Sequence, residues 1–328
     1  MKRALSIGIS LLILAAIYWK IDIVEMMRTF RDSDPLWMPV SLGMVVPLTM
    51  LTAWRLQQLM PSREAGEPNP LSFAEANRLI LAASSLNMVL PSKMGDIAKS
   101  YFMREKAQLS GSLSLSMVLF EKACDMLSLL LWCAFGLLVY PQKDVLFWAM
   151  TVGVAGGLGL GLLLLGSQSF ALFFFRLGRS LLPKKFKPKF DTLIAAWQEM
   201  HGYFWRDRRQ LLKITLTSTF IWFLHLLQIW MFILALKASV PFLANLALSP
   251  LALLAGLLPL TFAGVGTRDA AFILFYQSYF DDSTGAALGL LATARYFLPA
   301  IGGLPFLGKY FSEMQRLRQK PVEVKESA

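Results

Sequence analysis

The chain has 328 residues, of which 56% are hydrophobic and only 16% are charged, and its mean hydropathy is +0.54. This composition is typical of a polytopic membrane protein, and it argues against a sizeable soluble catalytic domain because spans and loops use most of the chain. The net charge of +11 is explained by basic cytoplasmic loops that attract anionic headgroups, so nucleic-acid binding is not expected.

In chain order, the hydrophobic runs predict six transmembrane helices. The first run follows the basic start Met1-Lys2-Arg3, and no small-x-small cleavage site precedes Lys20, so we interpret it as a retained span rather than a signal peptide. The predicted spans cover residues 4–19, 36–58, 112–139, 145–167, 214–236 and 284–308. The expected fold class is therefore an all-α polytopic membrane protein.

Two further apolar stretches do not fit a clean crossing and predict re-entrant broken-helix hairpins. Residues 79–91 are too short to span the membrane and lead into a polar element that contains Pro91 and Gly95. Residues 243–280 are long enough for two spans, but glycines and charges interrupt them between Pro259 and Asp269. Lipid offers no hydrogen-bond partner to a broken backbone, so both elements must be enclosed by protein or line a wet cavity.

Basic residues in the loops predict the orientation in the membrane, since such residues near span ends stay in the cytoplasm. The loop at 168–213, the first three residues and the tail at 311–328 are all rich in Lys and Arg. We therefore expect both termini to lie in the cytoplasm. The aromatic residues of the loop suit amphipathic helices that lie on the bilayer rather than a nucleic-acid stacking platform.

This topology also predicts an inverted repeat within a single membrane domain of residues 1–310. The unit span–hairpin–span at 36–139 would recur upside down at 214–308, because the first hairpin opens from the cytoplasm and the second from the opposite side. Inverted repeats with broken helices that meet near the midplane are the architecture of many secondary transporters.

Polar and glycine residues of the hairpins and of the spans that follow them form the candidate substrate-binding and translocation site. A charge at a helix centre costs roughly 2.5–3.5 kcal/mol on insertion scales, so charges in the spans are not expected to face lipid. In the structural alternative the charges neutralise one another, for instance Lys122 with Asp125 three residues on, and the glycines only permit positive φ. The candidates are Asn87, Pro91, Lys93, Gly95, Asp96, Lys99, Tyr101, Glu121, Lys122, Asp125, Pro259, Gly264, Gly266, Arg268, Asp269 and Arg295.

Other conspicuous residues receive structural interpretations. Arg55 is expected to extend to the headgroups from the inner end of its span, and the glycines between 153 and 161 are expected to permit close helix packing. The only two cysteines share one apolar run and the only two histidines are far apart, so no disulfide, metal or other cofactor is expected.

These motifs in combination resemble a known family. The resemblance depends on four motifs, in chain order Asn87-x-x-Leu-Pro-x-Lys-x-Gly-Asp-x-x-Lys-x-Tyr101, Glu121-Lys-x-x-Asp125, Pro259-x-Thr-x-x-Gly-x-Gly-x-x-Asp269 and Arg295. Together they resemble the membrane region of lysylphosphatidylglycerol synthases, which is the flippase-like domain of the multiple peptide resistance factor. The resemblance covers roughly residues 5–310, and the group also contains free-standing membrane proteins.

The chain departs from the family pattern in two respects. Lys93, Asp96, Lys99, Lys122 and Asp269 stand where the family has arginine and glutamate, which keeps the sign of each charge but loses bidentate arginine geometry. The soluble aminoacyl-transferase domain of the full-length synthases is not expected here. The resemblance therefore implies the lipid-moving half and not the synthase activity.

The residues and the resemblance together predict a protein that binds a membrane lipid and flips its headgroup across the bilayer, rather than an enzyme. In this hypothesis four cations receive a phosphate, while four carboxylates hold those cations or receive a cationic headgroup. The cations are Lys93, Lys99, Arg268 and Arg295, and the carboxylates are Asp96, Glu121, Asp125 and Asp269.

The expected ligand is an anionic, aminoacylated or polyprenyl-phosphate lipid. Two alternatives come from other classes: an intramembrane lipid or glycolipid transferase with Asp96 or Glu121 as general base, and a non-catalytic scaffold for lipid-modifying enzymes. The oligomeric state is left open, and a homo-oligomer or a partner enzyme of lipid synthesis would both be compatible with the sequence.

Overall fold

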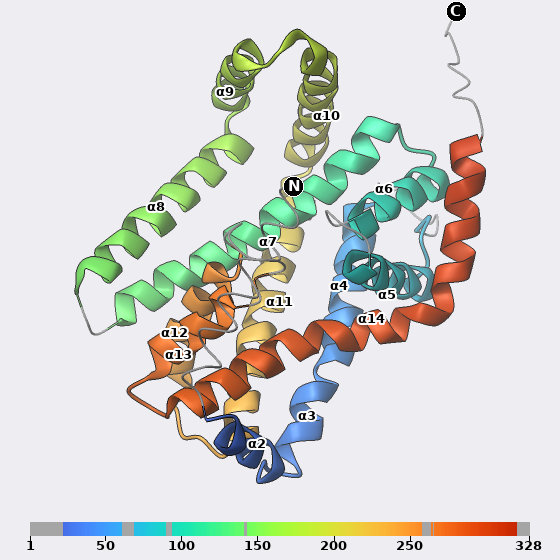
Figure 1. Cartoon of the computed structure of the whole chain (residues 1–328). Coiled ribbons are helices and arrows are strands. Elements are labelled where there is room, and N and C mark those ends of the chain that lie inside the picture. The colour runs from blue at the N-terminus through green and yellow to red at the C-terminus, as the bar shows by residue number, and fades with distance from the viewer. Residues whose placement is uncertain are drawn as a thin grey trace, which may run out of the picture.

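The computed structural model describes residues 22–60, 69–89, 94–140, 143–257, 264 and 266–319. The regular secondary structure of these residues is helical throughout (Figure 1), as the composition predicts. The predicted first span at 4–19 lies outside the described residues, and so do Pro91, Lys93 and Pro259 of the candidate site.

Five helices in the described ranges are long and apolar enough to cross a membrane, which confirms a multi-pass membrane protein. They are Trp37–Leu59, Gly111–Val139, Val145–Gly166, Arg208–Ala235 and Asp282–Gly308, and they coincide with the predicted spans from 36–58 onward. The first consists of α3 (Trp37–Gly43) and α4 (Val45–Leu59), preceded by the short helix α2 (Ile23–Arg31). The next three are α7 (Gly111–Val139), α8 (Val145–Gly166) and α11 (Arg208–Ala235), and the last is part of α14 (Asp282–Gln319).

The two interrupted stretches form helix pairs. Helix α5 (Phe73–Val89) packs against α6 (Met94–Ala107), and α12 (Phe242–Ala255) packs against α13 (Thr267–Tyr276). These helices have 17, 14, 14 and 10 residues. At 1.5 Å per residue the longest measures about 26 Å, which is less than the ~30 Å hydrocarbon core. Within the described residues, each limb is shorter than a typical crossing of about 20 residues, as the re-entrant prediction requires.

Local contacts around glycine hold each hairpin. Gly95 of α6 lies so near α5 that a Cβ atom there would be 2.1 Å from a backbone oxygen of α5, and its N–H donates to Asn87 Oδ1 at 2.9 Å. In the second hairpin Gly264 and Gly266 have φ values of 76° and 93°, which favour glycine. The Gly266 N–H donates to Asp269 Oδ2 at 2.8 Å and begins α13.

Helix contacts repeat between the two halves of the chain. Helix α4 packs against α5 and α6 against α7, just as α11 packs against α12 and α13 against α14. Each hairpin also packs against the last span of the other half, α5 against α14 and α12 against α7. Exchanging α4–α7 for α11–α14 therefore preserves these pairs of contacting helices. A two-fold repeat would have this property, and the inverted repeat itself stays a prediction.

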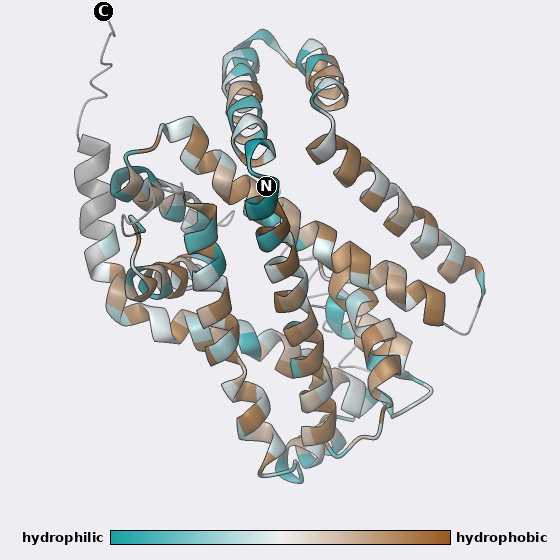
Figure 2. Cartoon of the chain, turned by 180° about the vertical axis from the view of Figure 1, so that it is seen from behind, coloured by the Kyte–Doolittle hydropathy of each residue, from teal (hydrophilic) through white to brown (hydrophobic). Residues whose placement is uncertain are grey.

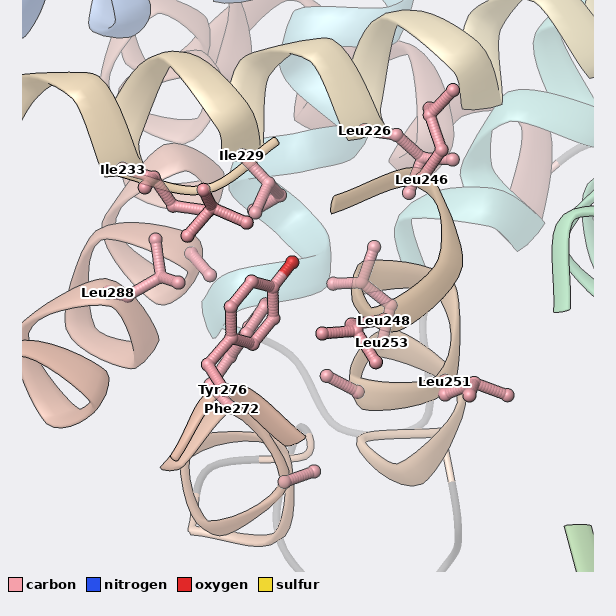
Figure 3. Close-up of a cluster of buried hydrophobic side chains, with 14 of the residues drawn as sticks. Leu226, Ile229, Ile233, Leu246, Leu248, Leu251, Leu253, Phe272, Tyr276 and Leu288 are labelled. Atoms are coloured by element: carbon pink, nitrogen blue, oxygen red, sulfur yellow. The ribbon is translucent and has the colours of Figure 1, made fainter. Parts of the chain in front are cut away.

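Apolar side chains fill the space beneath the second hairpin (Figure 3). Residues from α11, α12 and α14 surround Phe272 and Tyr276 of α13, both fully buried. The Tyr276 hydroxyl shares a hydrogen bond of 2.8 Å with Ser249 and donates to Asn245 at 3.1 Å, so its polar end is satisfied within α12. A second apolar cluster joins α4, α5, α6 and α7 to α10 (Lys187–Arg206) and α11 beneath the first hairpin.

Helix α8 and the helix that follows it project from the bundle (Figure 1), whereas α10 packs against α7. The basic loop contains α9 (Gln168–Leu181), a short 3-10 helix, η2 (Lys184–Phe186), and α10 (Lys187–Arg206). Figure 2 shows hydrophobic residues along α7, α8 and α11, and a mixture of hydrophilic and hydrophobic residues on α10. The loop is therefore helical, as the amphipathic interpretation expects.

The glycines of α8 allow close packing only in part. A Cβ atom on Gly157 or Gly161 would lie 3.2 or 2.7 Å from a leucine side chain of α7, whereas Gly153, Gly156 and Gly159 have nothing within 4 Å. Helix α8 therefore contacts α7 along a single face, and most of its surface is left to lipid.

Candidate functional site

A buried ionic cluster joins α4, α6 and α7 around Glu121. The Glu121 carboxylate accepts from Arg55 Nη2 at 2.8 Å and from Lys99 Nζ at 2.5 Å. All three side chains are at most 2% exposed. A buried charge is costly without a partner, so this contact fixes the first hairpin to the two spans beside it.

The other charged residues of the first hairpin and its following span extend this cluster. Arg55 also pairs with Asp125, and Lys99 lies 3.8 Å from Asp96. Lys122 pairs with Asp96 at 3.4 Å, across to α6 and not along α7 to Asp125 as the spacing had suggested. The first ionic cluster is Arg55, Asp96, Lys99, Glu121, Lys122 and Asp125. Its three cations and three carboxylates balance in formal charge.

The prediction that Arg55 extends to the headgroups is wrong. Its side chain is 2% exposed and donates to Ser218 of α11 at 3.0 Å as well as to the two carboxylates. The physical reason is that Glu121 and Asp125 lie four residues apart on one face of α7, where the forked guanidinium can bridge both. That carboxylate pair in an apolar run was the sequence signal that a cation from another span was needed.

A second polar cluster lies where α13 and α14 meet α11, and we define it as His225, Arg268, Thr293, Arg295 and Tyr296. Arg268 Nη2 donates to Thr293 Oγ1 at 2.5 Å, and Arg295 Nη2 donates to the Tyr296 hydroxyl at 2.9 Å. Arg295 Nη1 is 3.4 Å from His225 Nδ1. Both guanidinium groups lie over the Tyr296 ring, at 5.5 and 4.9 Å from its centroid.

Neither arginine of the second cluster forms an ion pair with a carboxylate among the described residues. Arg268 is 4% exposed and Arg295 is 3% exposed, and in the described chain the Nε atom of each has no hydrogen-bond partner. The neighbouring Asp269 forms no ion pair there; its Oδ2 accepts from the Gly266 N–H. Residues 258–263, just before this hairpin's glycines, contain no acidic residue.

Helix α11 connects the two clusters. Ser218, which contacts Arg55, and His225, which contacts Arg295, lie seven residues apart. Seven residues are two helical turns, so both side chains lie on one face about 10 Å apart. The polar groups of the two halves therefore meet along a single side of α11 inside the bundle.

The remaining candidates have local roles or stay apart. Asn87, Gly95, Gly264 and Gly266 shape the hairpins, while Tyr101 is 45% exposed and bonds to neither cluster in the described chain. Sequence reasoning missed Arg55, Ser218, His225, Thr293 and Tyr296 as site members. The usable signal was their polarity inside apolar spans, where ionisable and polar side chains mark functional contacts.

The described residues contain no group of three or more His, Cys, Asp and Glu side chains that could hold a metal ion. The contacts of the two clusters are ionic and hydrogen-bonding. The first ionic cluster is balanced in formal charge. The second cluster contains two buried arginines, whose Nε–H groups have no hydrogen-bond partner among the described residues.

A comparison with protein families gives a match over nearly the whole chain. The model described as Lysylphosphatidylglycerol synthase TM region matches residues 3–303, a range that includes both hairpins and both clusters. No curated protein matches the chain. The family is one of membrane proteins related to lipid modification, in agreement with the resemblance of the hairpin motifs. The chain therefore belongs to the lysylphosphatidylglycerol synthase TM region family.

Proposed function

We propose that the protein binds a membrane lipid through an anionic headgroup and flips that headgroup across the bacterial cytoplasmic membrane without changing it chemically. The lipid tail stays in the bilayer while the two hairpins give the headgroup access from opposite sides. The candidate ligands remain an anionic, an aminoacylated and a polyprenyl-phosphate lipid, which share a phosphate.

The observation that carries the proposal is the buried pair Arg268 and Arg295. Each is at most 4% exposed, and among the described residues neither has a carboxylate partner. An unpaired buried charge costs several kcal/mol, so a fold that retains two of them side by side is expected to gain a compensating anion. A phosphate can accept the free Nε–H groups, and charge-assisted hydrogen bonds to phosphate are among the strongest that side chains make.

The first ionic cluster has a different role in this proposal. Lys99, which the sequence suggested as a phosphate ligand, is bonded to Glu121 and serves to hold the first hairpin. Lys122 is 43% exposed although it lies within a transmembrane helix. A lysine is costly in lipid, so we assign it the first contact with an arriving headgroup. Lys93, outside the described residues, keeps its predicted role.

The same contacts argue against the transferase alternative. A general base needs a carboxylate that is free to accept a proton from a substrate. Glu121 is bonded to two cations, and Asp96 lies within 3.8 Å of Lys99 and 3.4 Å of Lys122. Both carboxylates are therefore already engaged by cations of the protein itself.

The test is a leaflet-accessibility assay on purified protein in liposomes that contain one fluorescent lipid of each candidate class. Wild type is compared with Arg295→Gln and with Arg78→Gln, a matched change at an exposed arginine of α5. Loss of a charged hydrogen bond is worth about 1.5–3 kcal/mol, so Arg295→Gln should slow transfer roughly 10- to 100-fold. Arg78→Gln should leave the rate unchanged.

Two further readouts separate this function from its alternatives. The melting temperature of Arg295→Gln in detergent should not fall, because the substitution removes an uncompensated buried charge; a structural arginine would behave in the opposite way. Mass spectrometry of the same liposomes should show no new lipid. Unchanged transfer in Arg295→Gln would refute the assigned site, and a new lipid mass would establish an enzyme instead.

A further inference from the structure

A cavity of about 640 Å³ lies apart from both ionic clusters, between the end of α8, the end of α10 and the start of α11. It arises because α8 packs against α7 and projects away from α11 (Figure 1). Trp205 of α10 closes one side, where its Nε1 donates to the Gly166 carbonyl oxygen at 3.3 Å. The lining residues are Gly166, Trp205, Arg208, Leu211, Leu212 and Thr215.

One cation, Arg208, lines this cavity. It is the first residue of α11, where the helix dipole adds positive charge, and Arg209 and Lys213 add further positive charge nearby without lining the cavity. Asp207 caps the helix by accepting the Arg209 and Gln210 N–H groups at 2.9 and 3.1 Å. Arg208 itself is exposed and makes no ion pair within the described part of the chain. An anion at the rim would relieve repulsion between like charges.

The wall changes from charged to apolar along α11. Arg208, Leu212 and Thr215 follow one another at helical spacing along one side of α11, over about 10 Å. Trp205 has the amphipathic character that places tryptophan at membrane interfaces. A polar rim above an apolar wall matches an amphiphile, and the volume lies within the roughly 300–1,000 Å³ of ligand pockets. A free phosphate would leave the leucine wall without a partner.

We infer that this cavity binds one phospholipid with an anionic headgroup, its phosphate on Arg208 and one acyl chain along Leu211, Leu212 and Thr215 between α8 and α11. This lipid is a bound component that fills the space between the two helices, distinct from the lipid that the arginine pair receives. The site is independent of the proposed function, because it shares no residue with either ionic cluster.

The test uses native mass spectrometry of the full chain in detergent, titrated with phosphatidylglycerol. All variants carry Arg295→Gln, so that the proposed transport site does not contribute. Arg208→Gln should weaken the retained adduct about fivefold or more, as loss of one cation at the headgroup implies. Arg209→Gln, an exposed neighbour that does not line the cavity, should change it less than about twofold.

A second pair of variants tests the acyl chain. Leu212→Trp fills the cavity and should displace the lipid about as strongly as Arg208→Gln, while Leu216→Trp should not, since Leu216 is equally exposed (60% against 58%) but lies outside the lining. Equal losses in Arg208→Gln and Arg209→Gln would reduce the site to general surface charge. Full retention in Leu212→Trp, or displacement by inorganic phosphate alone, would overturn the inference.

Discussion

Replacing Glu121 by Gln is expected to destabilise the protein strongly, because the carboxylate holds two buried cations. Its loss leaves Arg55 with Asp125 and Ser218, and leaves Lys99 with Asp96 at 3.8 Å. Removal of one partner from a buried ion pair costs about 3–5 kcal/mol, since the remaining charge stays desolvated. At about 2–3 °C per kcal/mol for a protein of this size class, the melting temperature should fall by roughly 6–15 °C.

The assay is thermal unfolding of purified protein in detergent, followed by tryptophan fluorescence. The matched control is Glu75→Gln, which breaks an ion pair of similar length, 2.6 Å, between side chains that are 48% and 34% exposed. Exposed pairs contribute about 0–1 kcal/mol, so the control should shift the melting temperature by no more than a few degrees.

A double variant makes the reasoning specific to the ion pair. Adding Lys99→Gln to Glu121→Gln removes one of the orphaned cations, so the double variant should be more stable than the sum of the single losses predicts. A shift for Glu121→Gln no larger than that for Glu75→Gln would refute the buried-pair argument. Strict additivity of Lys99→Gln and Glu121→Gln would refute their coupling.

Two other changes test the hairpin contact and the basic loop. Gly95→Ala should lower the free energy of unfolding by about 1–3 kcal/mol, because its Cβ atom would lie 2.1 Å from the Ala83 carbonyl oxygen. The control Gly159→Ala, at a position with nothing within 4 Å, should have a melting temperature no lower than that of wild type. An equal loss of stability in the two variants would contradict the Gly95 contact. Arg179 of α9 donates to the Asp191 carboxylate of α10 at 2.5 Å, and this hydrogen bond lowers the pKa of Asp191 below its usual 3.8. The stabilising contact between α9 and α10 is therefore present above pH 3.8 and is lost as the pH falls through the lowered pKa. Asp191→Asn should therefore speed amide hydrogen exchange at the end of α9 near neutral pH. If the variant still exchanged faster than wild type at the lowest pH, where the Asp191 carboxylate is protonated, the ion pair would not be the cause.

Much of the fold was readable from local sequence alone. Continuous apolar runs predicted the five spans of the described chain, and glycine, proline and charge predicted where the two apolar stretches break into hairpins. These features are local: a run of apolar residues crosses a bilayer whatever its neighbours are, and lipid forbids a broken backbone without protein around it. The polar residues of the hairpins and spans were likewise recognisable, because each is costly in a membrane.

Only the tertiary structure decided which charges are neutralised. Arg55 finds its carboxylates 66 and 70 residues away, on α7, and this pairing also commits Lys99 to Glu121. Arg268 and Arg295 meet over one tyrosine ring and have no carboxylate partner among the described residues. Pairing depends on which helix faces meet, and hydropathy along the chain carries no information about that. The sequence therefore determined that charged groups lie inside the membrane domain, whereas the packing of α11 against both halves determined which of them form ion pairs and which do not.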